Sequence, residues 1–80
     1  MDDKKILEVL NDIFKDIFDD DTLEIAAETT QEDIEEWDSL ANINIVFAVE
    51  DEFDIKFDVE EITKMKSVAV FIDEIKKKLA

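Results

Sequence analysis

Apolar residues recur every three or four positions over residues 3–18, which is the spacing of one buried face on an amphipathic helix. Asp2 and Asp3 at its start complement the positive end of the helix dipole, and the acidic residues 19–21 end the pattern. The pattern predicts a first helix from Asp3 to Phe18, whose apolar side comprises Ile6, Val9, Leu10, Ile13, Phe14 and Ile17.

Residues 19–38 show no sustained hydrophobic period, so we expect a long loop with one short helical turn near residues 31–35. Long irregular loops are unusual in compact domains and tend to be functional. Four widely spaced apolar residues would anchor this loop to the core, namely Leu23, Ile25, Ile34 and Trp37.

A second helix is predicted over residues 39–52, and its apolar arc is wider than one packing partner requires. Two explanations stay open. Some of these side chains are exposed and form a binding face, or the helix is central and contacted on two sides. The members of the arc are Leu40, Ile43, Ile45, Val46, Phe47, Val49 and Phe53.

Two further helices complete the pattern. A short one is predicted over residues 59–65, with Asp58 as N-cap and Glu61 three residues later in a variant of the capping box. Ser67 can cap the last helix, whose apolar stripe is Val68, Phe71, Ile72, Ile75 and Leu79. The predicted fold class is all-α: an irregular four-helix bundle of three longer helices and one short helix, with a long loop between the first two.

The composition agrees with a small helical domain. The 80 residues contain neither glycine nor proline, which removes the usual residues of hairpin turns and phosphate-binding loops. This length and 46% apolar content support one folded core, and we expect a single domain over residues 1–80. The N-terminal residues do not resemble a signal peptide, and no apolar segment approaches the roughly 20 residues of a membrane span, so we expect a cytoplasmic protein.

The chain is strongly acidic, with a net charge of −15 from 24 acidic and nine basic residues. This charge excludes nucleic-acid binding and disfavours anionic membrane surfaces. It suits a protein that docks on basic patches of its partners, although acids that serve only solubility stay an alternative.

Catalysis by the chain itself is not expected. It has no cysteine and no histidine, so Ser39 lacks the partner that would activate it as a nucleophile. The many carboxylates should mostly face water, and none shows the spacing of an EF-hand loop. We therefore predict that the chain is not an enzyme and holds no dedicated metal site.

Ser39 is nevertheless well placed for modification. At a helix N-terminus the unpaired backbone N–H groups and the dipole would stabilise an attached phosphate. The alternative is that Ser39 is only the N-cap, a common role of serine.

From the long loop onward the chain resembles the acyl carrier protein family. The segments that carry the resemblance are residues 32–34, the tetrapeptide Trp37-Asp38-Ser39-Leu40, residues 46–55, and Ser67-Val68. The resemblance implies that Ser39 Oγ is joined by a phosphodiester to 4′-phosphopantetheine, with Asp38 and Leu40 beside it. A separate, magnesium-dependent phosphopantetheinyl transferase would supply this arm from coenzyme A, and the arm's thiol would carry an acyl group as a thioester.

The resemblance also implies a surface for partner enzymes that load and process the acyl group and have basic docking patches, and we expect the carrier to be a monomer. The acidic contacts would be Asp38, Glu50 and Asp51. Ile55 and Ile62 would lie beside the arm, and the other contacts would be Leu40, Ile43, Asn44 and Phe47.

Two departures and one motif favour a specialised carrier over a housekeeping fatty-acid carrier. Asn44 stands where fatty-acid carriers usually have an acid, Phe57 stands where they often have proline, and Trp-Asp-Ser-Leu is commoner in specialised carriers. The cargo stays open between fatty-acid or polyketide acyl groups and the amino acids of an aminoacyl or peptidyl carrier. A non-carrier acidic interaction module is the remaining alternative.

Overall fold

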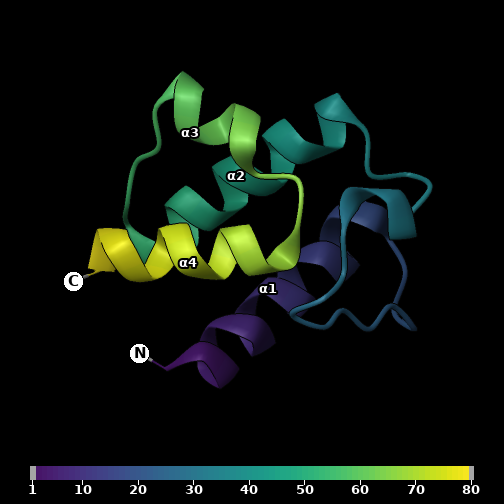
Figure 1. The fold of residues 1–80 in the computed structure, drawn as a ribbon. Helices are drawn as coiled ribbons and strands as arrows, with labels where there is room; N and C mark the ends of the chain where they lie inside the picture. Colours follow the sequence, from purple (N-terminus) through teal and green to yellow (C-terminus); the bar gives the residue numbers. More distant parts are fainter. Residues whose placement is uncertain (1, 80) are drawn as a thin grey trace.

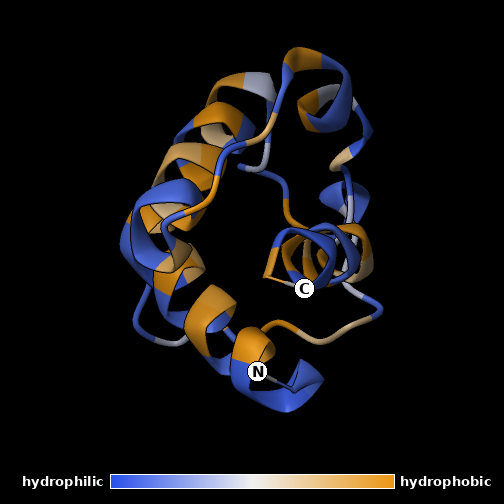
Figure 2. Ribbon diagram, turned by 90° about the vertical axis from the view of Figure 1, so that its left-hand side faces the viewer, coloured by the Kyte–Doolittle hydropathy of each residue, from blue (hydrophilic) through white to orange (hydrophobic). Residues whose placement is uncertain are grey.

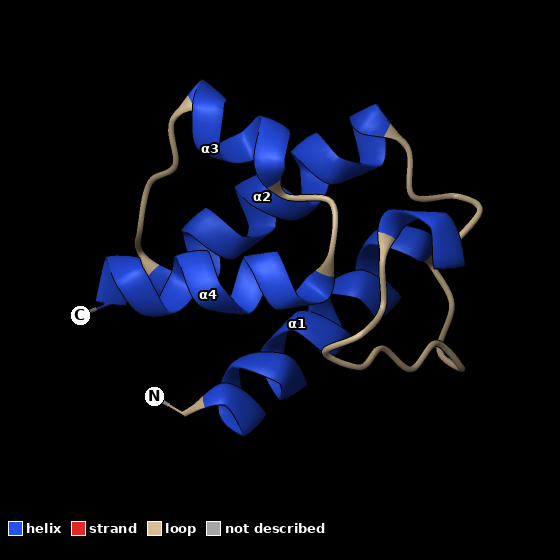
Figure 3. Ribbon diagram, in the orientation of Figure 1, coloured by secondary structure: helices blue, strands red, loops and turns tan. Residues whose placement is uncertain are grey.

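The computed structural model describes residues 2–79, and within them the chain forms helices and no strand (Figures 1 and 3). The predicted all-α bundle is confirmed, with helix ends that differ from the predicted ones by at most one residue. The turn expected in the loop is a 3₁₀ helix of three residues. The elements are α1 (Asp3–Phe18), η1 (Gln31–Asp33), α2 (Ser39–Phe53), α3 (Val59–Lys64) and α4 (Val68–Leu79).

Aspartates begin three of the four α-helices. The carboxylates of Asp2, Asp38 and Asp58 each accept a hydrogen bond, at 2.8 Å, from the backbone N–H three residues later. Asp58 and Glu61 form the predicted capping box, and the Ser67 hydroxyl caps α4 as predicted. Each cap satisfies a backbone N–H that has no partner inside its helix.

Aspartates also end two helices. Asp19 after α1 and Asp54 after α2 adopt the left-handed conformation, with φ of 51° and 55°. Glycine usually takes this position, and aspartate is among the few other residues that tolerate it. In a chain without glycine, these aspartates allow sharp helix ends.

The core lies between the helices, toward which the hydrophobic positions are largely turned (Figure 2). Phe14 contacts Trp37 edge-to-face, with ring centroids 5.0 Å apart, and lies 6.3 Å from Phe71. Phe14 and Phe71 are fully buried, as their places in the predicted apolar faces require. Leu79 corrects the prediction: it lies in the last turn of α4, past the buried Ile75, and is 41% exposed.

The long loop is fixed to the rest of the fold at several points. Its four predicted anchors are confirmed: Ile25 and Trp37 are buried, and Leu23 and Ile34 pack against the core while partly buried. On the α1 side, the Asn11 amide donates to the Leu23 carbonyl and accepts from the Ile25 N–H. The loop therefore has a defined path toward Ser39.

A short backbone pairing joins the loop to the connection between α3 and α4. Thr30 and Ser67 form an isolated antiparallel bridge. The Gln31 N–H donates to the Lys66 carbonyl at 2.8 Å, and the Val68 N–H donates to the Thr29 carbonyl at 2.9 Å. This pairing holds η1 and Lys66 next to each other, although they are far apart in sequence.

Candidate functional site

Ser39 is the first residue of α2 and is exposed. Asp38 is the N-cap of this helix: its carboxylate accepts from the Ala41 N–H at 2.8 Å. Among residues 2–79 the Ser39 hydroxyl has no hydrogen-bond partner. The alternative that Ser39 is the helix cap is therefore wrong, because Asp38 already has that role, and the Ser39 oxygen is left available for chemistry.

A buried hydrogen bond fixes the turn before Ser39. The indole Nε1 of Trp37 donates to Oδ1 of Asn42 at 3.0 Å, and both residues are buried. The Trp37 N–H donates to the Ile34 carbonyl, and the Asn42 N–H to the Asp38 carbonyl. Asn42 was not recognised in the sequence, where the only signal is a polar residue within an apolar helix a short way after a tryptophan.

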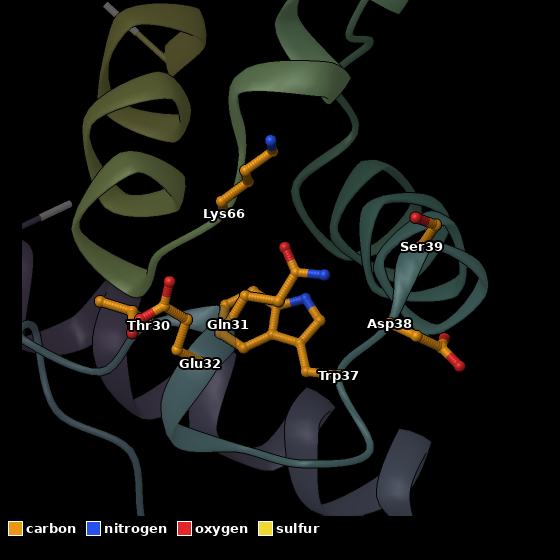
Figure 4. A pocket seen from close by; sticks show the side chains of 7 residues that line it. All are labelled: Thr30, Gln31, Glu32, Trp37, Asp38, Ser39 and Lys66. Carbon is orange, nitrogen blue, oxygen red and sulfur yellow. The ribbon is translucent and has the colours of Figure 1, made fainter.

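Two surface grooves meet at Ser39. The smaller groove, of about 290 Å³, lies between α2 and α3 and is lined by Gln31, Ser39, Asn42, Ile43, Ile62, Thr63 and Lys66. The larger groove, of about 710 Å³, lies toward η1 (Figure 4) and is lined by Thr30, Gln31, Glu32, Trp37, Asp38, Ser39 and Lys66. A group attached to Ser39 would have a groove on each side, and both grooves combine apolar and polar lining residues. Gln31 and Lys66 could not be recognised as site residues from the sequence, because the backbone pairing that brings them here has no sequence pattern.

The wide apolar arc of α2 lies partly in the core and partly on the surface. Ile45, Val46 and Val49 are fully buried in the core. On the other side Leu40 is 69% exposed, Ile43 is 41% exposed and Phe47 is 58% exposed, so these three form an apolar surface that begins next to Ser39. The arc is therefore divided between the core and the surface, and a binding role for its exposed residues stays a prediction.

The other predicted partner contacts have different settings. Asn44 and Asp51 are exposed on α2. Glu50 is partly buried, and its Oε2 accepts from the Phe57 N–H at 2.8 Å, so one side of this carboxylate is used inside the fold. The Asp38 carboxylate is exposed while it caps α2.

The two predicted neighbours of the arm are separated by the fold. Ile62 on α3 lines the smaller groove together with Ser39. Ile55 is partly buried, packs against the core, and lines neither of the two grooves. The geometry thus brings Ile62 and not Ile55 to the rim of the site.

The ion pairs of residues 2–79 involve only the three lysines of the last turn of α4. Lys76 binds Asp3 at 2.8 Å, Lys78 binds Glu61 at 3.0 Å, and Lys77 pairs with neighbours on its own helix. The hydrogen bond to Asp3 raises the pKa of Lys76, and the backbone N–H of Asp58, followed by Lys78, lowers the pKa of Glu61. None of these residues lines a groove at Ser39, so the paired charges belong to the scaffold.

Two features that residues 2–79 lack bear on the kind of site. Among residues 2–79, no group of three or more His, Cys, Asp or Glu side chains could hold a metal ion. No helix in residues 2–79 is long and apolar enough to cross a membrane.

An exposed serine at the start of the second helix of a small acidic four-helix bundle is the arrangement of a carrier domain, and comparisons with solved structures bear this out. An acyl carrier protein of Geobacter metallireducens, solved by NMR in its holo form, is 39% identical with a TM-score of 0.83, and the match covers 92% of this chain and 85% of that one. An acyl carrier protein of Thermotoga maritima, solved by crystallography, is 32% identical with a TM-score of 0.83, over 99% of this chain and 92% of that one.

The chain therefore belongs to the acyl carrier protein family, and its function is that of an acyl carrier. No protein-family model matches the chain, and no curated protein sequence matches it. The assignment rests on solved structures that match nearly the whole chain in both fold and sequence.

Proposed function

We propose that Ser39 carries a 4′-phosphopantetheine arm and that the protein presents acyl intermediates on this arm to partner enzymes. The observation that carries the proposal is the division of roles at the start of α2. Asp38 caps the helix, whereas the Ser39 hydroxyl is exposed and has no hydrogen-bond partner among the described residues.

The residues around Ser39 fit a phosphodiester. The N-terminus of a 15-residue helix offers unpaired backbone N–H groups and a partial positive charge to an anion attached at its first residue. The two grooves leave room for the arm beside the serine, and Lys66, which lines both, supplies a cation. When bound, the arm supplies the thiol that holds an acyl group as a thioester.

Loading of the arm needs only an accessible hydroxyl from this chain. The Ser39 oxygen forms a bond to a phosphorus of coenzyme A, and the pyrophosphate bond breaks. The adenosine bisphosphate leaves with the electron pair, and the hydroxyl proton passes to a base on the transferase. A chain without histidine and cysteine can take part because the transferase supplies the base.

Partner enzymes would dock on α2. Leu40, Ile43 and Phe47 supply an apolar surface beside Ser39, and the exposed Asp51 supplies a negative charge. A complementary partner has an apolar depression with basic residues at its rim. Glu50 would contribute less than a fully exposed acid, because its Oε2 already accepts a hydrogen bond from the Phe57 N–H.

We infer a specialised acyl carrier rather than a housekeeping one. Asn44 is exposed on the outer side of α2, so a partner cannot form there the ion pair that an acid would allow. A cationic side chain on the partner facing Asn44 would have no negative charge to pair with. This lack would select against partners built for acidic carriers.

The test is the mass of the protein after expression with and without an active phosphopantetheinyl transferase. We expect a gain of about 340 Da in the presence of the transferase, which is the mass of the arm. Ser39→Ala should abolish the gain, whereas Ser67→Ala, at the only other serine of the chain, should leave it unchanged. If the mass does not change with a transferase that modifies a control carrier, the proposal is wrong.

A further inference from the structure

Lys66 stands out among the nine basic residues of the chain. It lies in the connection between α3 and α4, and it is the only basic residue that lines either groove at Ser39. Within residues 2–79 it forms no ion pair, whereas all three lysines at the end of α4 do. Its cation is therefore available next to the site.

The backbone around Lys66 is held in place. Its carbonyl accepts from the Gln31 N–H at 2.8 Å, and the following residue, Ser67, forms the bridge with Thr30. In the view of Figure 4, Lys66 and Ser39 come from different segments on opposite sides of the larger groove, and the Gln31 amide lies in the space between them. A fixed backbone limits where the Lys66 ammonium can reach, and Lys66 lines both of the grooves that Ser39 lines.

We propose that Lys66 binds the phosphodiester on Ser39 and thereby directs the arm toward the α3 side of the molecule. This inference rests on the proposed function, because it needs an arm on Ser39. Lys66 acts as a positioning residue and takes no part in the chemistry at the thiol.

The charges around Ser39 explain why one lysine can have this effect. The phosphodiester adds a negative charge next to Asp38 and near Glu32, both of which line the larger groove and repel it. The dipole of α2 attracts the phosphate to the helix end but favours no direction for the rest of the arm. Lys66 is the one basic residue in either groove, so it can favour one direction for the arm. A phosphate oxygen readily accepts a hydrogen bond from an ammonium group.

The position of the arm can be measured without any partner enzyme. A nitroxide attached to the arm's thiol broadens the NMR signals of nearby amides, and the relevant ones are Gln31, Ile62 and Lys66 or its replacement. In Lys66→Gln we expect less broadening of these signals than in the wild type. The decrease should correspond to a groove-bound population of the arm about two- to fivefold lower, as for the loss of an exposed ion pair. Lys66→Arg should restore it, and high salt should weaken it in the wild type.

Lys64→Gln is the matched control, because it removes the same charge from the end of α3 and Lys64 lines neither groove. It should behave like the wild type. The melting temperature of apo Lys66→Gln should equal that of the apo wild type, which separates a positioning role from a structural one.

Equal broadening in the wild type and Lys66→Gln overturns the inference, and so does equal loss in Lys64→Gln, which would indicate a general charge effect. Both results leave the proposed function intact, because the mass gain of about 340 Da is measured first on each variant. A wild-type chain that gains no mass overturns the proposed function and this inference together.

Discussion

The two sides of α2 have similar residues and opposite roles. The inner side places Ile45, Val46 and Val49 in the core with no exposed surface, whereas the outer side leaves Ile43 and its apolar neighbours in solvent. Helix α2 is therefore apolar nearly all round, which is typical of a helix surrounded by protein. Here the chain's own residues cover only the inner side of α2. The exposed outer side is therefore available to other proteins.

The inner side also contains a polar contact that the outer side lacks. Asn42 is the one polar residue buried among residues 2–79, and it is paired with Trp37. A buried hydrogen bond requires a particular geometry of its two partners, so this one fixes the position of the helix start rather than merely burying area. The site thus has a buried hydrogen bond beneath Ser39 and an exposed surface above it.

The strongest test of the comparison uses two isoleucines of α2. Ile45→Ala removes buried methyl groups and leaves a cavity, so we expect the free energy of unfolding to fall by about 2–5 kcal/mol. Ile43→Ala, on the exposed side, should change it by less than about 0.5 kcal/mol. Urea unfolding followed by circular dichroism measures both. Similar losses in the two variants would show that the two sides do not differ as described.

Trp37→Phe tests the buried hydrogen bond and should have the next largest effect. It keeps an aromatic ring near Phe14 but leaves Oδ1 of Asn42 buried without a donor, so we expect a loss of about 1–3 kcal/mol in the free energy of unfolding. Thermal or urea unfolding gives the value.

The double variant Trp37→Phe/Asn42→Val is the control, because it removes both hydrogen-bond partners. It should recover part of the loss, since no polar atom is then left unpaired. If the double variant is less stable than Trp37→Phe, the hydrogen bond does not account for the cost.

The helices could be predicted from the sequence because their apolar spacing and caps are local. Asp58, Glu61 and Ser67 cap their helices as expected, and the loop anchors Ile25 and Trp37 are buried as expected. A periodic pattern of this kind depends only on neighbours within a few residues. The fold class followed from these features together with the absence of glycine and proline.

The details of the site could not be predicted, because they depend on residues that are distant in sequence. Asp38 and Ser39 are both good N-cap residues at adjacent positions, and sequence does not decide between them. Lys66 reaches the site only through the pairing of Thr30 with Ser67, a contact between backbones. Periodicity likewise cannot tell which part of a continuous apolar arc the other helices will cover.

The smallest of these effects concerns docking on the outer side of α2. Phe47→Ala removes an exposed aromatic ring without opening a cavity, so the melting temperature should stay within a few degrees of the wild type. If this ring contacts the transferase, kcat/KM for loading of the arm should fall about three- to tenfold, as for a moderate interface residue.

Val59→Ala is the matched control for exposed apolar surface, since Val59 on α3 is 75% exposed and lies outside both grooves at Ser39. Its kcat/KM should stay within about twofold of the wild type, as expected for a residue outside the contact. Equal losses in the two variants would mean that any exposed apolar residue serves docking. The outer side of α2 would then have no special role, and the contrast between its two sides would concern stability alone.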